Sequence, residues 1–322
     1  MSIADTSAAP TVRHTIATPC MFEGRGLHTG NACRVRVAPA PAGAGVRLRV
    51  PGHPPVRVHV DRADTFPLRT GVVVSTQATV CTVEHLLAAL WIEGLDDVIL
   101  EVTGGEIPLL DGSAASFLAG LRQAGRQALP APRHVWKVVA PVEVRWGDPD
   151  TGATRLARLD PLPDDARDGL VVDVTLDVPN PGIGRQVWTG RIDPAHAASE
   201  LAPARTFALE RDVQAMLDAG YIRGADATRA LTYDAAGATP RAAPFWTDEP
   251  VRHKTLDILG DLVLAGADIR GHLRVERPGH LLTHALLRAA LATPGVLRKV
   301  AETVPAPASC PVLWAPGLAR PA

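Results

Sequence analysis

The order of its elements constrains this chain most: short alternating apolar runs are followed by helical segments, and the same order returns in the second half. Pro and Gly turns separate the runs, which is typical of antiparallel strands. Strands followed by helices, twice, indicate two α+β domains of similar plan. The similarity is one of order alone, because the two halves show no sequence repeat. With 322 residues, the chain is long enough for both domains.

The expected boundaries follow from the same patterns. In the first half we expect strands at 33–38, 45–50, 56–60 and 97–102, and helices at 80–94 and 113–127. In the second half we expect strands at 136–146, 154–159, 170–176, 184–190, 229–233 and 271–276, and helices at 210–219, 249–265 and 278–292. Leu129-Pro130-Ala131-Pro132 is the predicted linker, which gives domains of 12–129 and 133–300. Flexible tails are expected at 1–11 and 305–322.

Charge and cysteine usage exclude several classes of protein. A formal net charge of −1 offers no basic surface for nucleic acid or an acidic membrane. Cys20, Cys33, Cys81 and Cys310 form no CxxC pair, which argues against a zinc ribbon or a disulfide framework and suits a reducing compartment. Residues 1–12 lack the features of a signal peptide, and no apolar run is long enough to span a bilayer. We therefore expect a cytoplasmic protein without a transmembrane segment, and we expect a monomer.

The helix expected at 249–265 carries a polar stripe. His253, Asp257 and Asp261 recur at every fourth residue, so they share one side of the helix. A histidine and a carboxylate one turn apart lean over the same turn and can hold a divalent metal. The same spacing also fits a solvated polar face that contains a histidine. A third ligand elsewhere in the chain is needed to favour a metal site over a solvated polar face.

A second predicted helix offers that ligand. The segment 82–92 is apolar nearly all round, with Glu84 and His85 as its polar exceptions, so we expect it to be buried on most sides. Burying a carboxylate beside a histidine costs free energy unless both are paired or bind a metal. One interpretation is a structural hydrogen bond between the two in a core. In the other, His85 binds a metal and Glu84 faces the water on that metal.

His85, His253 and Asp257 would together make a set of two histidines and one carboxylate. Nitrogen and oxygen donors without thiolates favour Zn²⁺ first and Fe²⁺ second. Three protein ligands leave one coordination position open for water, which is the pattern of catalytic zinc.

Several separate motifs resemble one family, and they occur in that family's order. They are Gly26-Leu27-His28-Thr29-Gly30, Thr82-Val83-Glu84-His85-Leu86, Glu106-Ile107-Pro108-Leu109-Leu110-Asp111-Gly112-Ser113-Ala114, Ala204-Arg205-Thr206-Phe207, His253-Lys254 with Asp257 and Gly260-Asp261-Leu262, and Gly279-His280. Each motif is weak alone, but together they cover about 12–300. On these residues the chain closely resembles the UDP-3-O-acyl-N-acetylglucosamine deacetylases, the zinc amidases of lipid A biosynthesis.

The resemblance implies a fold and a reaction. The fold has two α+β domains, each a sheet with helices on one face, with the helices of both packed between the sheets and the active site at the domain junction. The reaction removes the 2-acetamido group of UDP-3-O-acyl-N-acetylglucosamine and releases acetate, the committed step of lipid A biosynthesis. The partner it implies is therefore a UDP-linked acylated amino sugar.

The resemblance also implies roles for individual residues. Glu84 would be the base, and His280 would be the cationic acid that protonates the leaving amine. Asp261 would orient His280 and keep its pKa high, while Thr206 and Lys254 would lie near the oxyanion. Taken alone, Asp261 and Lys254 also fit solvated positions, and His280 fits an ordinary position at a helix N-terminus.

Substrate contacts follow from the same resemblance. Loops that touch substrate or flank the reacting carbonyl in the family correspond here to those with His28, Phe66, Leu68, Arg205 and Phe207. An insertion in the second domain of the family forms an apolar passage for the acyl chain. Its counterpart is about 212–234, with candidate walls at Met216, Leu217, Tyr221 and Ile222. Core packing of that small unit explains the same four residues equally well.

The chain departs from the family pattern close to the substrate. The loop 64–70 is one residue longer, and Arg69 stands where a small or apolar residue is common. Thr283 replaces a common Asn, and His284 stands where the pattern requires no histidine, so we expect little from it. All metal and acid–base residues are present, which argues against a non-catalytic binding protein. The departures leave one alternative, a paralogous zinc deacetylase that acts on a different N-acylated amino sugar.

Overall fold

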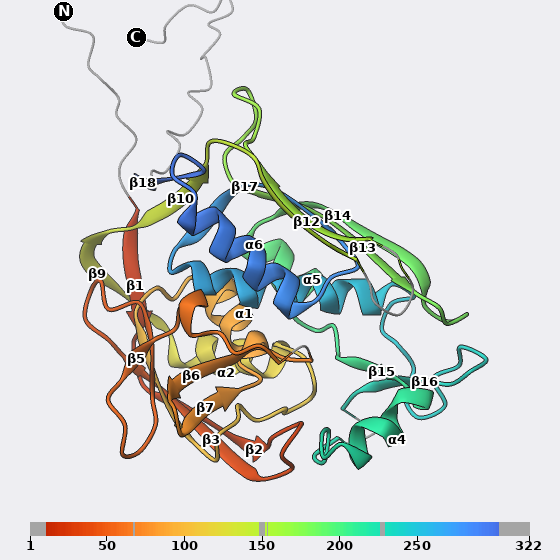
Figure 1. Cartoon of the computed structure of the whole chain (residues 1–322). Helices are drawn as coiled ribbons and strands as arrows, with labels where there is room; N and C mark the ends of the chain where they lie inside the picture. Colours follow the sequence, from red (N-terminus) through yellow and green to blue (C-terminus); the bar gives the residue numbers. More distant parts are fainter. Residues whose placement is uncertain (1–10, 67, 148–151, 153, 226–228, 303–322) are drawn as a thin grey trace, which may run out of the picture.

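A computed structural model describes residues 11–302 of the chain, apart from 67, 148–151, 153 and 226–228. The expected flexible tails lie outside this part, except for Thr11. The N–H of Thr11 donates to the Glu302 carbonyl at 2.8 Å, so the two ends of the described chain meet (Figure 1).

The first half builds a five-stranded sheet. Its elements are β1 (Val12–Ile16), β2 (Cys20–Arg25), β3 (Ala32–Pro39), β4 (Val46–Arg49), β5 (Val56–Arg57), η1 (Val60–Arg62), β6 (Gly71–Ser75), β7 (Ala78–Cys81), α1 (Glu84–Glu93), β8 (Val98–Thr103), α2 (Ala115–Ala124) and β9 (Arg126–Pro132). The strand order is β2-β3-β8-β4-β5, in which β8 runs antiparallel to β3 and parallel to β4. Alternate residues face the core, as Val35 and Val37 of β3 do, and neither is exposed.

The second half builds a larger, seven-stranded sheet. Its elements are β10 (His134–Val138), β11 (Val142–Gly147), β12 (Thr154–Asp160), β13 (Leu170–Val178), β14 (Gly184–Ile192), α3 (Pro194–Glu200), β15 (Phe207–Leu209), α4 (Glu210–Asp218), β16 (Leu231–Tyr233), α5 (Glu249–Leu262), η2 (Val263–Ala265), β17 (Asp268–Glu276), α6 (His280–Ala292) and β18 (Leu297–Ala301). The long strand β17 organises this sheet, because it pairs with β10, β12 and β13 along its length.

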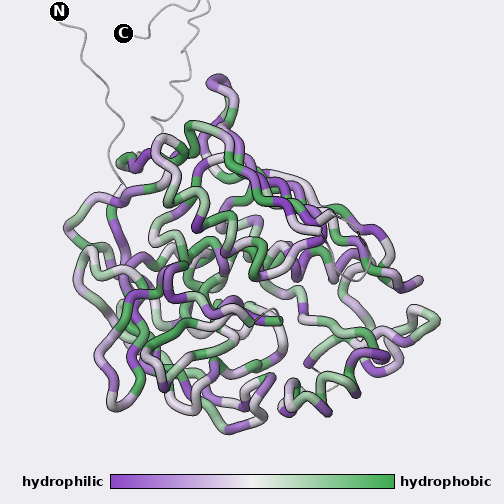
Figure 2. Tube along the Cα trace, viewed as in Figure 1, coloured by the Kyte–Doolittle hydropathy of each residue, from purple (hydrophilic) through white to green (hydrophobic). Residues whose placement is uncertain are grey.

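Helices of both halves fill the space between the two sheets (Figure 1). The helix α1 packs against α2 and α5, and α5 packs in turn against α6, β13 and β14. Green hydrophobic segments run along these helices in Figure 2, and Leu86, Leu87 and Leu90 of α1 have no exposed surface. The predicted α+β architecture, with helices between two sheets, is therefore confirmed.

Three predictions for the first half are wrong. The strand expected at 56–60 ends at Arg57, and the 3-10 helix η1 begins at Val60. The helix expected at 80–94 begins only at Glu84, because 78–81 form β7 and pair with β6 in a hairpin. Thr82 then separates strand from helix with a φ of 57°, which no helix interior contains. The expected linker at 129–132 is the end of β9, which pairs with β1 in a two-stranded sheet. Its prolines are tolerated because such a strand is an edge strand.

In the second half, the strand expected at 136–146 is two strands. β10 pairs with β17 and β18, whereas β11 pairs with β12. Pro141 lies between them, and the chain changes partners there because proline has no N–H to donate to a ladder. Asp248 occupies the N-cap position of α5 as predicted, but its carboxylate accepts from Arg252 instead of from the helix backbone.

A small unit of β15, α4 and β16 lies beside the main body (Figure 1). β15 and β16 pair in parallel, and α4 has no fully buried residue. This unit contains the expected insertion at 212–234, of which 226–228 lie outside the described residues. Across the described chain, every helix is too short or too polar to cross a membrane.

Candidate active site

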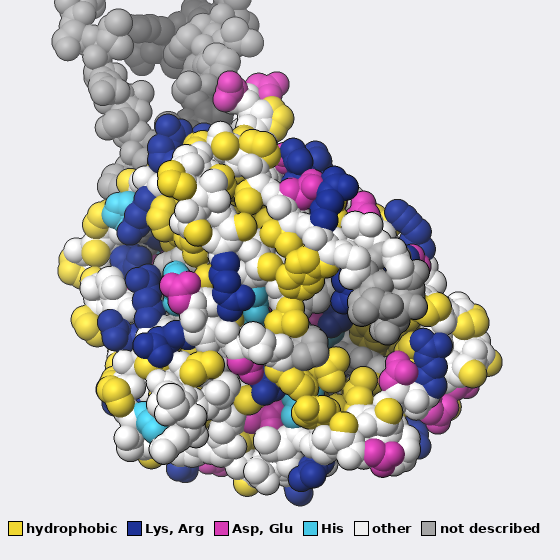
Figure 3. Space-filling view, in the orientation of Figure 1, with side chains coloured by type: hydrophobic (Ala, Val, Ile, Leu, Met, Phe, Trp, Pro, Cys, Tyr) yellow, Lys and Arg dark blue, Asp and Glu magenta, His cyan; other side chains and the backbone are white. Residues whose placement is uncertain are grey.

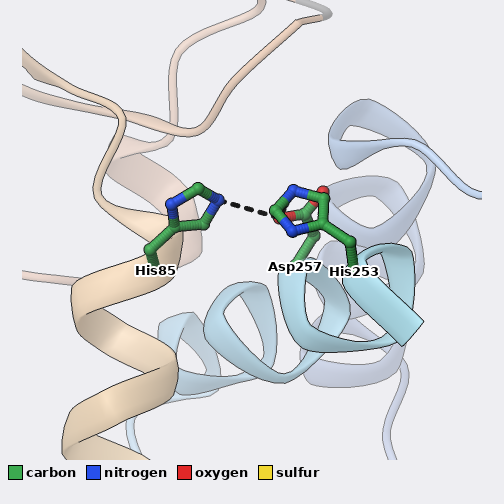
Figure 4. Close-up of side chains that lie close together, drawn as sticks. All are labelled: His85, His253 and Asp257. Carbon is green, nitrogen blue, oxygen red and sulfur yellow. Dashed lines mark ion pairs between the residues drawn. The ribbon is translucent and has the colours of Figure 1, made fainter. Parts of the chain in front are cut away.

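The helices α1 and α5 touch at the beginning of α1. Gly260 of α5 lies against the backbone of Glu84, where a Cβ on residue 260 would come within 2.0 Å of the Glu84 carbonyl oxygen. Only glycine permits this approach without displacing one of the two helices. As a result, His85 at the start of α1 faces His253 and Asp257 on α5 (Figure 4).

His85, His253 and Asp257 direct one donor atom each toward a common point (Figure 4). The Nε2 atoms of both histidines lie 3.4 Å from Oδ1 of Asp257, and the three donor atoms lie within 4.8 Å of one another. None of the three residues is more than 4% exposed. The interpretation of this stripe as a solvated polar face is therefore wrong.

This donor set fits a divalent metal. Nδ1 of His253 lies 3.0 Å from the carbonyl oxygen of Ala204, so Nδ1 carries the ring proton and Nε2 presents a lone pair. Lys254 Nζ donates to Oδ2 of Asp257 at 2.8 Å, whereas Oδ1 is buried without a hydrogen-bond partner in the described chain. Donors that lie about 2.1 Å from a tetrahedral metal are about 3.4 Å apart, which matches the distance from Oδ1 of Asp257 to each histidine Nε2.

The protonation states around this point also suit a metal. Burial lowers the pKa of His253 to about 3, so the ring is neutral. Burial alone would raise the pKa of Asp257, but His253 and Lys254 outweigh burial and hold this pKa well below its usual range. A neutral imidazole and an ionised carboxylate are the forms that coordinate metals.

Glu84 is buried beside the donor set. Burial raises the pKa of Glu84, and its Oε2 accepts the N–H of Thr70 at 3.1 Å. His85 takes no part in this hydrogen bond, because its Nε2 faces Asp257 and its Nδ1 has no partner among the described residues. The alternative of a structural hydrogen bond between Glu84 and His85 is therefore wrong. A buried carboxylate with a raised pKa is suited to act as a general base near neutral pH.

A second histidine and carboxylate form a pair close to the donor set. His280 is the first residue of α6, and its Nδ1 lies 3.0 Å from Oδ2 of Asp261. Its Nε2 lies 3.9 Å from Oδ2 of Asp257. Burial would lower the pKa of His280, but Asp261, Glu84 and Asp257 outweigh burial and raise it to about 9. His280 is therefore protonated at neutral pH and can donate a proton. Asp261 is 1% exposed, so it is not a surface acid.

Known proteins of one family match nearly the whole chain. The family model described as LpxC, UDP-3-O-acyl N-acetylglycosamine deacetylase, matches residues 13–292. The chain belongs to this family. The UDP-3-O-acyl-N-acetylglucosamine deacetylase of Anaeromyxobacter sp. (strain Fw109-5) is 37% identical over 93% of this chain and 96% of its own length. That of Phenylobacterium zucineum (strain HLK1) is 37% identical over 89% of this chain and 95% of its own length. That of Bdellovibrio bacteriovorus (strain ATCC 15356 / DSM 50701 / NCIMB 9529 / HD100) is 31% identical over 90% of this chain and 93% of its own length.

This member of the LpxC family has a cavity of about 740 Å³ beside the donor set. Four expected site residues line it where it borders the donor set, namely Thr206, Phe207, Lys254 and His280. Apolar side chains line another part, namely Leu68, Val213, Met216, Leu217 and Ile222. Figure 3 shows yellow hydrophobic side chains gathered around this hollow. His28 lines the cavity too, and burial lowers its pKa to about 4.

Arg205 lies outside the cavity lining that the structure describes. Its Nε pairs with Oε1 of Glu249 at 2.9 Å, and its guanidinium lies 4.1 Å from the ring centroid of Phe245. The ion pair anchors the loop before β15 to the start of α5, and the expected substrate contact of Arg205 stays a prediction.

Phe66 also lies outside that lining, in the loop that departs from the LpxC pattern. Its ring packs against Tyr221 at 4.7 Å and against His28 at 5.8 Å between centroids. The guanidinium of Arg69 lies 4.7 Å from the Phe66 ring centroid, and its Nη1 pairs with Oδ2 of Asp64 at 2.6 Å. The longer loop thus contacts His28 through Phe66, and Arg69 packs on Phe66.

Thr70 and His284 lie beside the pair of His280 and Asp261, although no sequence pattern pointed to them. The hydroxyl of Thr70 donates to Oδ1 of Asp261 at 2.5 Å. Nε2 of His284 lies 3.1 Å from the same hydroxyl oxygen, and neither residue is exposed. The expectation that His284 contributes little is not supported by this position.

Glu106 is a further buried residue that the sequence used only for recognition. Thr82 has positive φ two residues before α1, a conformation that costs about 1–3 kcal/mol in a non-glycine residue. Oε1 of Glu106 accepts the Thr82 hydroxyl at 2.8 Å and the His28 N–H at 2.9 Å. Glu106 therefore fixes the strained turn that aims Glu84 and His85, and it ties this turn to the His28 loop.

Proposed function

We propose that the chain hydrolyses the 2-acetamido group of UDP-3-O-acyl-N-acetylglucosamine and releases acetate. One observation carries this proposal: the donors of His85, His253 and Asp257 converge close to a buried carboxylate, Glu84, and a buried cation, His280. Amide hydrolysis needs a base for the attacking water and an acid for the leaving nitrogen. Relatives that match nearly the whole chain carry the name of this deacetylase, which supports the substrate.

We also propose that the donor set holds Zn²⁺, with Fe²⁺ as the alternative, because two nitrogens and one oxygen without thiolate suit both ions. Bound Zn²⁺ supplies a Lewis acid and lowers the pKa of a coordinated water to about 7. The donors come from both of the domains that we place at 12–129 and 133–300. The five-stranded sheet uses residues before this boundary and the seven-stranded sheet residues after it, which supports the division.

The chain's own residues supply the proton transfers. The carboxylate of Glu84 accepts a proton from the water that attacks the acetamide carbonyl carbon. His280 is charged below about pH 9, so it stabilises the oxyanion and then gives its Nε2 proton to the leaving amine nitrogen, and acetate departs. Asp261 accepts at Nδ1 of His280, which keeps Nε2–H available for that transfer. Thr206 and Lys254 line the cavity close to these groups, and we assign them to the oxyanion.

The cavity suits both ends of an acylated UDP-sugar. Met216, Leu217 and Ile222 offer an apolar wall to an acyl chain. Arg223 and Arg241 line the same cavity and complement the charge of a diphosphate. In this substrate, the acyl chain would contact the apolar wall and the diphosphate would contact the cationic side chains of the same cavity.

Acetate release from UDP-3-O-(3-hydroxyacyl)-N-acetylglucosamine tests the proposal directly. The zinc-loaded full chain should release acetate, and a chelator should stop the release. Glu84→Gln is the matched variant, because it should keep one zinc per chain and still lose about 10²–10⁴-fold in kcat. The proposal fails if the zinc-loaded chain releases no acetate, or if Glu84→Gln turns over like the wild type.

A second candidate is a deacetylase for a different N-acylated amino sugar. The longer loop favours it, because Arg69 packs on Phe66, and Phe66 packs against His28 in the cavity lining. This candidate predicts a higher kcat/KM for another acetylated amino sugar than for UDP-3-O-acyl-N-acetylglucosamine. Substrates that vary first the nucleotide and then the sugar would separate the two candidates.

A further inference from the structure

Thr70 contacts two carboxylates of the candidate site: Glu84, the proposed base, and Asp261, the partner of the proposed acid His280. It is fully buried in the loop of the first half that lies against α5 and α6. Its N–H donates to Oε2 of Glu84 at 3.1 Å, and its hydroxyl donates to Oδ1 of Asp261 at 2.5 Å. The bond to Asp261 depends on the side chain, so a substitution can remove it while the backbone bond to Glu84 remains.

His284 extends this contact by one step. It lies one turn after His280 on α6, and its Nε2 lies 3.1 Å from the Thr70 hydroxyl oxygen. Its Nδ1 is buried without a hydrogen-bond partner in the described chain. A proton on Nε2 therefore has an acceptor, whereas a proton on Nδ1 would have none.

One arrangement of protons gives an acceptor to the Thr70 hydroxyl, to Nε2–H of His284 and to Nδ1–H of His280. Nε2–H of His284 donates to Oγ1 of Thr70, and the Thr70 hydroxyl donates to Oδ1 of Asp261. Nδ1–H of His280 faces the other oxygen, Oδ2 of Asp261, at 3.0 Å and Oγ1 of Thr70 at 3.1 Å, so Thr70 also contacts His280 directly. Both oxygens of Asp261 are then fixed, so the carboxylate cannot turn away from His280, and the His280 ring keeps its orientation.

We propose that Thr70 and His284 are positioning residues for the deacetylation, in a hydrogen-bonded chain that runs from His284 through Thr70 to Asp261 and holds the Asp261 carboxylate against His280. This proposal rests on the proposed function, because it concerns the residue assigned as the acid. The chain of hydrogen bonds acts on orientation and not on substrate affinity.

Steady-state kinetics on the zinc-loaded full chain test this role. Thr70→Val keeps the shape and removes the hydroxyl, and it should lower kcat about 10–100-fold with KM within about threefold of wild type. Thr70→Ser restores the hydroxyl and should recover most of kcat. His284→Leu should lower kcat, and His284→Gln, which can place a donor near the position of Nε2, should lose less.

A matched control separates positioning from a general loss of stability. Thr15 is a buried threonine in the first half whose hydroxyl donates to the Asp97 carbonyl at 2.6 Å, outside the candidate site. Thr15→Val should lower Tm and leave kcat unchanged. The double variant Thr70→Val/His284→Leu should be no slower than Thr70→Val alone, because both changes break one chain. Additive losses, or an unchanged kcat in Thr70→Val, would overturn the proposal.

Ring nitrogen NMR of the zinc-loaded protein gives a readout that does not depend on turnover. His284 should carry its proton on Nε2, and Thr70→Val should shift the ring signals of His284 and His280. A proton on Nδ1 of His284, or rings that do not respond to Thr70→Val, would overturn the proposal. An absence of acetate release by the wild type would refute the proposed function instead, and the ring signals would still decide whether this chain of hydrogen bonds exists.

Discussion

Two largely buried charge clusters connect the halves of this molecule, and they differ in how completely their polar atoms are paired. Arg133 lies at the centre of the first. Its Nε, Nη1 and Nη2 pair with carboxylate oxygens of Asp96, Glu302 and Asp268 at 2.8, 2.6 and 2.7 Å. Burial would lower the pKa of Arg133, but these carboxylates outweigh burial and raise it. Every nitrogen of this guanidinium therefore has a partner.

The second cluster, between α1 and α5, leaves a donor atom unpaired. Oδ1 of Asp257, which Nε2 of both histidines faces, is buried without a hydrogen-bond partner among the described residues. Native proteins rarely leave buried polar atoms in this condition unless a ligand completes them. Completeness of pairing, and not the number of buried charges, therefore distinguishes the candidate site from a structural cluster.

Asp257→Ala should break the second cluster with the largest effect on activity. It removes the donor that both histidines face, so we expect loss of the metal and a fall in kcat/KM of at least about 10³-fold. Metal content per chain and acetate release measure the two losses. A variant that keeps a full zinc complement would show that Asp257 is not a ligand.

Arg133→Met should break the first cluster with a large effect on stability and little effect on chemistry. It leaves Asp96 and Asp268 without the cation they pair with, and Glu302 with Arg270 alone, so we expect a loss of about 3–5 kcal/mol in the free energy of unfolding. Urea unfolding measures this loss. The folded variant should keep its metal and its kcat, and a parallel fall in kcat at full folding would contradict the division between the two clusters.

The pH dependence of activity should sharpen the comparison. The charged form of His280 is present below its pKa of about 9 and is lost above it, so kcat/KM should fall as pH rises through about 9. Asp261→Asn removes the carboxylate that raises this pKa, so the alkaline limb should move to lower pH. A limb that stays in place in Asp261→Asn would remove His280 as the acid.

Glu23→Ala provides the smallest expected effect and a reference for exposed charges. Glu23 lies 3.6 Å from Arg34, and both side chains are more than half exposed. Solvent screens such a pair, so the free energy of unfolding should change by less than about 0.5 kcal/mol. A loss comparable to that of Arg133→Met would show that pairing matters equally at the surface.

The sequence predicted elements with a strong local period and missed those that depend on distant partners. The polar and apolar positions of α5 and α6 placed both helices within about three residues of their observed ends. The end of β9 resembles a linker because its prolines suggest a turn, and it is a strand only because β1 lies beside it. β18 was not predicted for the same reason, because its partner β10 lies far earlier in the chain.

The candidate site divides in the same way. His85, His253 and Asp257 could be predicted because metal-binding residue types at fixed spacing carry a local signal. Thr70 could not, because a threonine in a loop carries no such signal. Its contacts with Glu84 and with Asp261 arise only when the first half closes over α5.

The hydrogen bond between Thr11 and Glu302 shows that the two ends of the described chain are adjacent, so the fold does not require the chain to begin and end there. A short peptide that joined 302 to 11 would close the polypeptide into a ring without stretching either end. Such a ring could be reopened in the exposed turn at 41–43, between β3 and β4, and no sheet pairing would be lost. A circular permutant of this kind should fold into the same two sheets, with its new termini in the turn at 41–43.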